Sequence, residues 1–364
     1  SGNIVFPGFT APKLEWVREN EPEIFSKVHK VLLPAAYLNY YLTGDFVADM
    51  SDSAGTSWLN VGKRDWSDYL LDVGHMRRDQ MPRLVEGAEA AADLRPALRS
   101  GWGLSGKVIV AGGAGDNAAA ACGMGALDGG QGFVSVGTSG VILAARDGYR
   151  PAPETAVHTF CHAVPGRWYQ MGVMLSATDS LNWLARIVGK SPSELTAAMG
   201  DTLQGPGSVR FLPYLSGERT PHNDSEIQGS ITGVFTDTSV EDLTRGVLEG
   251  VAFALRDCFD ALTAQDARMD QLIAIGGGTK SRYWLRLIST VLNVPLQLPK
   301  SGEFGAALGA ARLGMSASTR APMDSIITPP SICETIDPDP TLLETLGEAH
   351  RAFAAAYPAI KRIQ

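Results

Sequence analysis

The chain has 364 residues, of which 45% are hydrophobic and 19% charged, and its formal net charge is -8. This length is more than one ordinary hydrophobic core supports and predicts two domains, while the composition excludes a disordered chain. The acidic balance, without any cluster of Lys and Arg, argues against nucleic acids and anionic membranes as partners.

Cysteine and histidine spacing gives no sign of a disulfide framework or a metal centre. The four cysteines are widely separated, at positions 122, 161, 258 and 333, so we expect buried, reduced thiols. His158 and His162 lie four residues apart in an extended segment, where they would not meet, and no metal site is predicted. No apolar run is long enough for a membrane span and no signal peptide is evident, which predicts a cytoplasmic protein.

The first hundred residues show mainly helical patterns. Residues 13–43 are predicted to be mostly helical, with Pro34 restarting a helix at its first turn and Gly44 ending it. Residues 65–98 predict two or three short helices. The three glycines within residues 101–106 predict a hinge or linker.

From residue 107 the pattern changes to short apolar strands that end in glycine turns. Strands are predicted at 107–111, 133–136, 141–145, 168–175, 209–215, 271–275 and 296–298, and helices at 177–188, 240–264, 281–292, 305–314 and 340–362. Strands interleaved with helices predict an α/β domain. Because glycine turns follow three of the strands, several loops are expected to converge on one ligand.

Asp116 follows the first of these strands and the turn Gly112–Gly115, at a predicted helix start. Such a turn lets the backbone approach a ligand closely, and the helix amides point outward. A carboxylate there can accept the proton of a substrate hydroxyl that attacks a phosphorus atom. The local pattern alone favours a plainer role as a helix cap, and the two roles are compatible.

Two further glycine turns suit a nucleotide. Gly137, Thr138 and Ser139 offer free amides and hydroxyls to phosphate oxygens, and an ordinary hairpin turn fits the same residues equally well. Gly276, Gly277 and Gly278 follow a strand and precede a helix, without the Gly-Lys-Ser/Thr of a Walker A loop. Adenine or ribose could lie against three glycines. The alternative is a tight strand-to-helix connection that needs a positive φ.

Four side chains invite a simpler structural interpretation. Trp16 is expected in the core rather than against a ligand. Asp179 is expected to cap a helix. Arg219 and His222 lie in a polar loop, where they could bind phosphate, brace a hinge or belong to a solvated turn.

Longer motifs resemble one family. Residues 8–20 match the first signature of the FGGY carbohydrate kinases throughout, and residues 229–234 with 242–249 resemble the second, with Gly246 where Ala or Ser is usual. Residues 112–117, 134–140 and 275–278 resemble the family's catalytic loop, phosphate motif and adenosine motif. Residues 49–56 and 216–223 most resemble the family's kinases of xylulose. The resemblance covers nearly the whole chain.

This resemblance implies an α/β, actin-like ATPase fold of two ribonuclease H-like domains. The remainder of a sugar-binding domain would occupy residues 1–106 and a nucleotide-binding domain residues 107–364. The implied reaction phosphorylates a ketose, D-xylulose giving D-xylulose 5-phosphate, with ATP and Mg²⁺. Asp116 would be the base, Asn117 would help to bind the sugar, and the glycine turns would hold ATP. A homodimer is also implied.

One family feature has no counterpart among these residues. Family members begin with a strand carrying Asp-x-Gly-Thr, followed by a sugar-binding segment, so we expect a first domain that is incomplete and a chain that is inactive by itself. The Mg²⁺ ligands would lie in the absent segment. Two alternatives stay open: an inactive regulator that binds ATP or sugar, and a kinase for ribulose, glycerol or gluconate.

Overall fold

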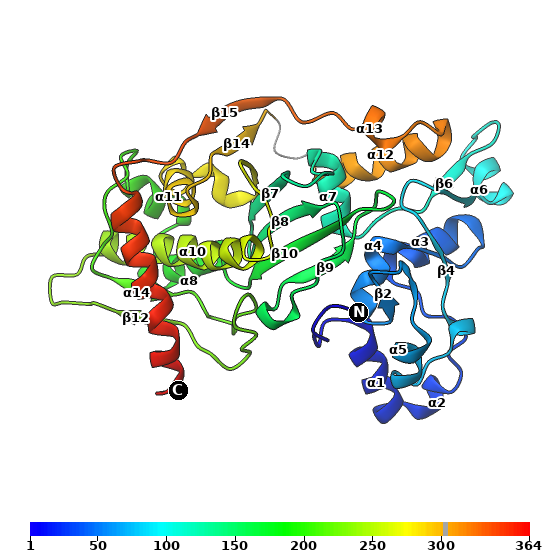
Figure 1. Cartoon of the computed structure of the whole chain (residues 1–364), viewed down its shortest axis with the longest axis horizontal. Coiled ribbons are helices and arrows are strands. Elements are labelled where there is room, and N and C mark those ends of the chain that lie inside the picture. Colours follow the sequence, from blue (N-terminus) through cyan, green and yellow to red (C-terminus); the bar gives the residue numbers. More distant parts are fainter. Residues whose placement is uncertain (301–304) are drawn as a thin grey trace.

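A seven-stranded sheet forms the centre of the larger part of the chain (Figure 1). The computed structural model describes residues 1–300 and 305–364. The strands of this sheet are β7 (Gly132–Val136), β8 (Gly140–Arg146), β9 (His158–Cys161), β10 (Trp168–Met174), β13 (Leu272–Ile275), β14 (Leu296–Pro299) and β15 (Ile332–Ile336). Their order is β15-β14-β13-β7-β8-β10-β9. β13 runs parallel to both β7 and β14, and the other pairs are antiparallel.

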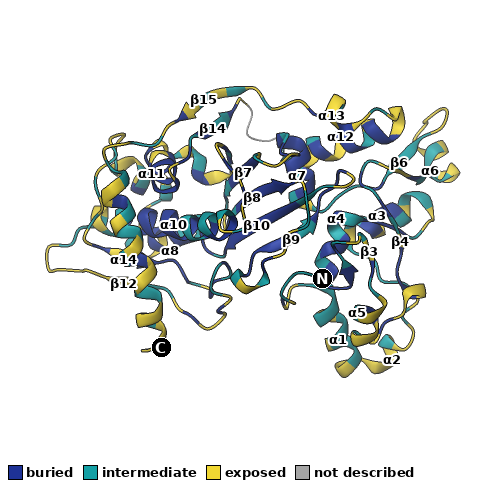
Figure 2. Cartoon of the chain, in the orientation of Figure 1, coloured by how far each residue is buried: buried dark blue, intermediate teal, exposed yellow. Residues whose placement is uncertain are grey.

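Helices cover both faces of this sheet, because alternate residues of its strands enter different cores. Val134 and Val136 of β7 join a core with α8 (Thr178–Val188), α10 (Val240–Thr263) and α11 (Arg282–Leu292), whereas Phe133 joins a second core with α7 (Asp116–Met124) and α12 (Gly305–Thr319). The strands β7, β8 and β10 are correspondingly buried throughout most of their length (Figure 2). The helices of this part are α7 (Asp116–Met124), α8 (Thr178–Val188), α9 (Pro192–Ala198), α10 (Val240–Thr263), α11 (Arg282–Leu292), α12 (Gly305–Thr319), α13 (Met323–Ile326) and α14 (Leu343–Lys361).

Shorter elements complete the chain. Its N-terminal part, in blue and cyan in Figure 1, holds helices α1 (Thr10–Asn20), α2 (Pro22–Phe25), α3 (Pro34–Thr43), α4 (Met50–Ser53), α5 (Asp68–Val73) and α6 (Pro96–Gly101). Its strands form three pairs: β1 (Val47–Asp49) with β4 (Arg83–Val85), β2 (Leu59–Asn60) with β3 (Asp65–Trp66), and β5 (Ala90–Asp93) with β6 (Ile109–Ala111). A fourth pair, β11 (Arg210–Leu212) with β12 (Ser230–Thr232), lies in the larger part.

Short 3₁₀ turns are η1 (Ala54–Thr56), η2 (Arg78–Gln80), η3 (Pro153–Thr155) and η4 (Gly277–Lys280).

Local signals placed many elements correctly. Pro34 is the first residue of α3, and Gly44 ends that helix with a φ of 93°, as expected of a left-handed glycine cap. The hairpin of β7 and β8 and the long helix α10 lie where the pattern predicted them. The expectation for residues 13–43 is right for three helices but wrong for residues 26–33, which are not helical.

The expectation of two or three short helices in residues 65–98 is confirmed by α5, η2 and the start of α6, but it missed the strands between them. Strands β4 and β5 occupy part of this segment, and β5 has the sequence Ala-Ala-Ala-Asp. Alanine favours helices in isolation, but pairing with β6 outweighs that weak preference. Of the residues 101–106, expected to form a hinge or linker, Gly101 ends α6 and residues 102–106 belong to its connection to β6, which pairs with β5. The division into domains after residue 106 stays a prediction.

Burial corrects two side-chain expectations. Trp16 is 56% exposed, so its placement in the core was wrong: α1 packs through Ala11 and Leu14 on another side. Cys122, Cys161 and Cys258 are buried free thiols as expected, whereas Cys333 is exposed. Among the helices described, none has both the length and the apolar character needed to cross a membrane.

Candidate active site

Asp116 is the first residue of α7 and its side chain is exposed. Its Oδ1 accepts hydrogen bonds from the backbone N–H of Asn117 at 2.6 Å and from Asn117 Nδ2 at 2.9 Å. The helix cap is Gly115, one residue earlier, so the expectation that Asp116 caps the helix was wrong. The carboxylate therefore stands at a helix N-terminus, oriented by its neighbour and accessible to a substrate.

A second acidic segment lies beside this loop. Asp49 ends β1 and caps the short helix α4, where its Oδ2 accepts from the N–H of Ser51 at 2.7 Å and of Asp52 at 3.0 Å. A Cβ placed on Gly115 would lie 3.4 Å from Asp52 Oδ1. The sequence analysis noted this segment only for its resemblance. Nothing in its local pattern indicates that it meets Gly115, 64 residues after Ser51.

The Asp52 carboxyl is perturbed by this position. Burial, and then the negative charges of Asp49 and Asp116, raise its pKa to about 7. Burial also raises the pKa of Asp49, against the hydrogen bonds that this carboxylate accepts. Burial, and then the charges of the same three carboxylates, raise the pKa of Tyr169 in β10. A group with a pKa raised to about 7 therefore lies next to the turn Gly112–Gly115.

Replacing Asp52 by Asn should stabilise the protein at alkaline pH. Folding raises the pKa of this carboxyl from 3.8 to about 7, so the folded state keeps a proton that the unfolded state loses. The wild type should therefore lose stability as pH rises between these values, and the non-titrating Asn should not. Thermal unfolding of both proteins at about pH 5 and about pH 8 measures this difference.

The advantage of the D52N variant should be larger at the higher pH. The exposed Asp45 provides the matched control: the difference in stability between D45N and the wild type should not increase with pH. A D52N advantage that is the same at both pH values would show that the Asp52 carboxyl is not perturbed by folding.

The turn Gly137–Ser139 connects β7 to β8, so the hairpin geometry is confirmed. The turn is held against the start of α8, where the N–H of Thr178 donates to the carbonyl of Gly137 at 2.9 Å. The side chains of Thr138 and Ser139 are exposed, which leaves two hydroxyls beside a helix N-terminus. α8 is capped by Ala177 and Asp179 is its second residue, so the cap predicted at Asp179 was wrong.

The glycines 276–278 pack directly on the end of β7. Gly276 has a φ of 95°, and a Cβ there would lie 2.7 Å from the carbonyl oxygen of Val136. A Cβ on Gly278 would lie 2.4 Å from Val136 Cγ1. The structure therefore has the tight strand-to-helix connection with a positive φ that the sequence analysis gave as the alternative to a nucleotide contact. It also brings the third glycine turn next to the second, because β13 and β7 are parallel neighbours.

A cavity of about 830 Å³ opens beside these glycines. It lies between α8, α9 and the start of α11, and its lining includes Thr178, Leu181, Thr196, Gly277, Gly278 and Tyr283. Its volume is in the range of small-molecule pockets, and its mixed lining could receive a base and ribose. The bare backbone of Gly277, where a Cβ would meet no atom within 4 Å, leaves room for a ligand there.

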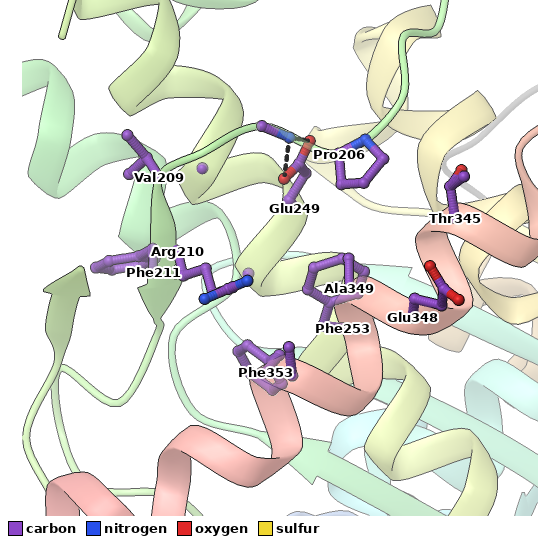
Figure 3. A pocket seen from close by; sticks show the side chains of 14 residues that line it. Pro206, Val209, Arg210, Phe211, Glu249, Phe253, Thr345, Glu348, Ala349 and Phe353 are labelled. Carbon is purple, nitrogen blue, oxygen red and sulfur yellow. Dashed lines mark hydrogen bonds between the residues drawn. The ribbon is translucent and has the colours of Figure 1, made fainter. Parts of the chain in front are cut away.

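A different cavity, of about 320 Å³, lies between β11, α10 and α14 (Figure 3). Phe211, Phe253 and Phe353 contribute apolar surface to it, and Glu249 accepts a hydrogen bond from the N–H of Gly207 at 3.0 Å. Its lining includes none of the site residues predicted from the sequence.

Gly246 also lines this cavity. A Cβ on Gly246 would lie 2.7 Å from Val209 Cγ1, so this departure from the second signature keeps the contact close.

Arg219 and His222 brace the fold. Arg219 Nη1 lies 3.2 Å from His158 Nε2, and its guanidinium stands 4.8 Å from the Phe6 ring centroid. Burial and then the Arg219 charge lower the pKa of His158 to about 3, so this histidine is neutral. His222 stacks on Tyr357 with ring centroids 3.6 Å apart. The solvated turn was therefore the wrong alternative for both residues.

Residues 1–123 match the N-terminal domain of the FGGY family of carbohydrate kinases, and residues 132–318 match its C-terminal domain. The chain belongs to this family. The α/β fold of a two-domain FGGY sugar kinase, expected from the sequence, is thus confirmed, and kinases of this family use ATP as phosphate donor.

Relatives and solved structures point to one group within the family. A xylulose kinase of Escherichia coli strain K12 is 47% identical over 319 residues, covering 87% of this chain and 66% of the relative. One of Klebsiella pneumoniae is 42% identical over 363 residues, 99% of this chain and 75% of the relative. A crystal structure described as a xyloylose kinase from Brucella ovis has 55% identity and a TM-score of 0.98, and covers all of this chain and 75% of that one. The chain thus spans about two thirds to three quarters of these relatives.

Proposed function

We propose that this chain carries much of the catalytic machinery of a kinase that transfers the γ-phosphoryl group of ATP to D-xylulose, giving D-xylulose 5-phosphate. The observation that supports it best is the exposed carboxylate of Asp116 at the start of α7, in a chain whose relatives are named xylulose kinases. Glycerol, gluconate and ribulose remain comparison substrates, because the family's nucleotide motifs are shared among its sugar kinases.

Asp116 would accept the proton of the sugar's primary hydroxyl as that oxygen attacks phosphorus. The two hydrogen bonds from Asn117 fall on the same carboxylate oxygen, Oδ1, so they orient the carboxylate while Oδ2 can face the hydroxyl. Asn117 would contact the sugar as well. Closure of the two domains around the substrates would exclude water, which otherwise would compete as the acceptor.

The two remaining glycine turns would hold ATP. Amides and hydroxyls of Gly137, Thr138 and Ser139 would meet the phosphates, next to the N-terminus of α8. The adenosine would enter the cavity bordered by Gly277 and Gly278. The hairpin of β7 and β8 and the positive φ of Gly276 account for the backbone geometry of the two turns without any bound ligand. Exposed hydroxyls, a helix N-terminus and the neighbouring cavity are what support nucleotide binding.

Mg²⁺ would accompany ATP and neutralise charge on its phosphates. Within residues 1–300 and 305–364, no group of three or more His, Cys, Asp or Glu side chains is arranged to hold a metal ion. No step is assigned to the ion. A cytoplasmic location and a homodimer stay predictions.

The test is sugar-dependent ADP release with Mg²⁺ and ATP, for the 364-residue chain and for the complete product of its gene. D-Xylulose, L-xylulose, D-ribulose, L-ribulose, glycerol and gluconate form the panel. The highest kcat/KM is expected with D-xylulose in the complete product. Retained ATP binding without turnover on any sugar would instead favour a regulator that has lost the reaction.

A further inference from the structure

Four hydrogen bonds tie the proposed catalytic loop Gly112–Gly115 to the N-terminal part of the chain, the first from the N–H of Gly112 to the carbonyl of Glu89 at 2.9 Å. Asn39 Nδ2 donates to the carbonyl of Gly112 at 2.9 Å, and the N–H of Gly113 donates to the carbonyl of Gly87 at 3.1 Å. The N–H of Gly115 donates to Ser51 Oγ at 3.0 Å. The last tie is the closest to Asp116, since Gly115 is its immediate neighbour and the cap of α7.

The Ser51 hydroxyl is itself held in one orientation. It is buried, with Ser51 only 1% exposed, and it donates its proton to Asp49 Oδ2. A hydroxyl has one proton, so donation to Asp49 leaves its lone pairs to accept the Gly115 N–H. Asp49 is also buried, and backbone N–H groups of Ser51 and Asp52 fix its carboxylate. Asp49, Ser51 and Gly115 thus form a chain of hydrogen bonds that ends at the catalytic loop.

This chain of hydrogen bonds holds the residue at which α7 starts. Gly115, the N-cap, has no side chain that could accept from the first turn of α7, and among the described residues the Asp116 carboxylate accepts hydrogen bonds from the adjacent Asn117. α4 lies in contact with this residue, because a Cβ on Gly115 would be at an ordinary van der Waals distance of 3.4 Å from the Cα of Asp52. The place where α7 begins, and with it the position of the Asp116 carboxylate, is therefore set by contact with α4.

We propose that Ser51, oriented by Asp49, is a positioning residue that fixes the Asp116 carboxylate against the sugar hydroxyl. The inference rests on the proposed function, in which Asp116 is the base. It assigns to the segment Asp49–Asp52 a role in the phosphoryl transfer step, although neither Asp49 nor Ser51 needs to touch the substrate.

The helix α4 offers a matched pair of variants for the test. Ser51→Ala removes the hydroxyl that accepts from Gly115. Ser53→Ala removes an equally buried hydroxyl two residues on, which has no hydrogen-bond partner in the described part of the chain. Misplacement of a reacting group by about 1 Å can cost about 100-fold in rate, so S51A should lower kcat by about 10- to 100-fold. S53A should stay within about twofold of the wild type, since it breaks no such contact.

Two further readouts separate positioning from a general loss of structure. The KM for the sugar and the Kd for ATP should change little in S51A, because the lost contact orients the base rather than the substrates. Asp49→Asn keeps a side-chain oxygen that can accept from Ser51, so it should lose less kcat than Asp49→Ala. This second pair tests the inference even if S51A folds poorly.

Hydrogen exchange of the backbone gives a readout that does not need turnover. Exchange in residues 112–117 should be faster in S51A than in S53A and the wild type. Equal exchange and equal kcat in S51A and S53A would overturn the positioning role. Faster exchange in S51A alone, in a protein that turns over no sugar, would keep the positioning role and reject the proposed function instead.

Discussion

Replacing Asp116 by Ala in the complete protein is expected to abolish most of the turnover while ATP still binds. Loss of a general base typically costs about 10²- to 10⁴-fold in rate, which here should appear in kcat. ATP binding should persist, because the glycine turns 137–139 and 276–278 lie on other strands of the fold. Sugar-dependent ADP release and calorimetric titration with ATP measure the two effects separately.

Two variants control this experiment. Asp116→Asn keeps the size of the side chain and an oxygen that Asn117 can reach, yet it cannot take a proton, so it should be nearly as inactive. Asp237→Asn removes an exposed carboxylate elsewhere and should leave kcat unchanged. Near-normal turnover in both Asp116 variants would contradict the assignment of the base. Asp52, whose pKa lies near 7, would then be the next carboxylate to test.

Replacing Gly309 by Ala should strongly destabilise the packing of α12 against α7, the helix that begins with Asp116. Gly309 is buried where α12 packs against α7, and a Cβ there would lie 1.8 Å from the carbonyl oxygen of Ala119. The clashing atom belongs to the backbone, which cannot move away by a rotamer change as a flexible side chain can. The two helices must therefore separate to accommodate the Cβ. Overpacking of this kind costs about 1–3 kcal/mol and occasionally more. Urea unfolding of the variant and the wild type measures the loss.

Gly314 in the same helix supplies the matched substitution. A Cβ on Gly314 would meet no atom within 4 Å. Alanine is about 1 kcal/mol more favourable than glycine in a helix interior, so G314A should be as stable as the wild type or more stable. If G309A unfolded at the same urea concentration as G314A, α12 and α7 would not be packed as described.

Short-range sequence signals were sufficient to predict an element wherever the residues that stabilise it lie close together in the chain. The hairpin of β7 and β8 needs only two apolar runs around Gly137–Gly140, and both strands form as predicted. The caps of α3 are likewise local, since Pro34 and Gly44 act through their own backbone angles. The FGGY signatures are long enough to indicate the family before any contact is known.

Local signals failed where partners lie far along the chain. Ala90–Asp93 forms a strand because β6 pairs with it, against the helical preference of alanine. Trp16 lies on the exposed side of α1, although its size suggested the core. Asp116 is not the cap of α7: the helix begins at Asp116, one residue earlier than a cap at Asp116 would require, and the N–H of the capping residue Gly115 donates to the distant Ser51 hydroxyl.

The sequence by itself therefore determined the family, the carboxylate of Asp116 as candidate base and the glycine turns as candidate ATP contacts. Only the tertiary structure decided what surrounds them. It placed β13 beside β7, so that Gly276 and Gly278 pack on Val136, next to the turn 137–139, and it brought α4 against Gly115. The physical reason is that hydrogen bonds and burial between distant segments depend on the whole fold, whereas turn and helix signals act within a few residues.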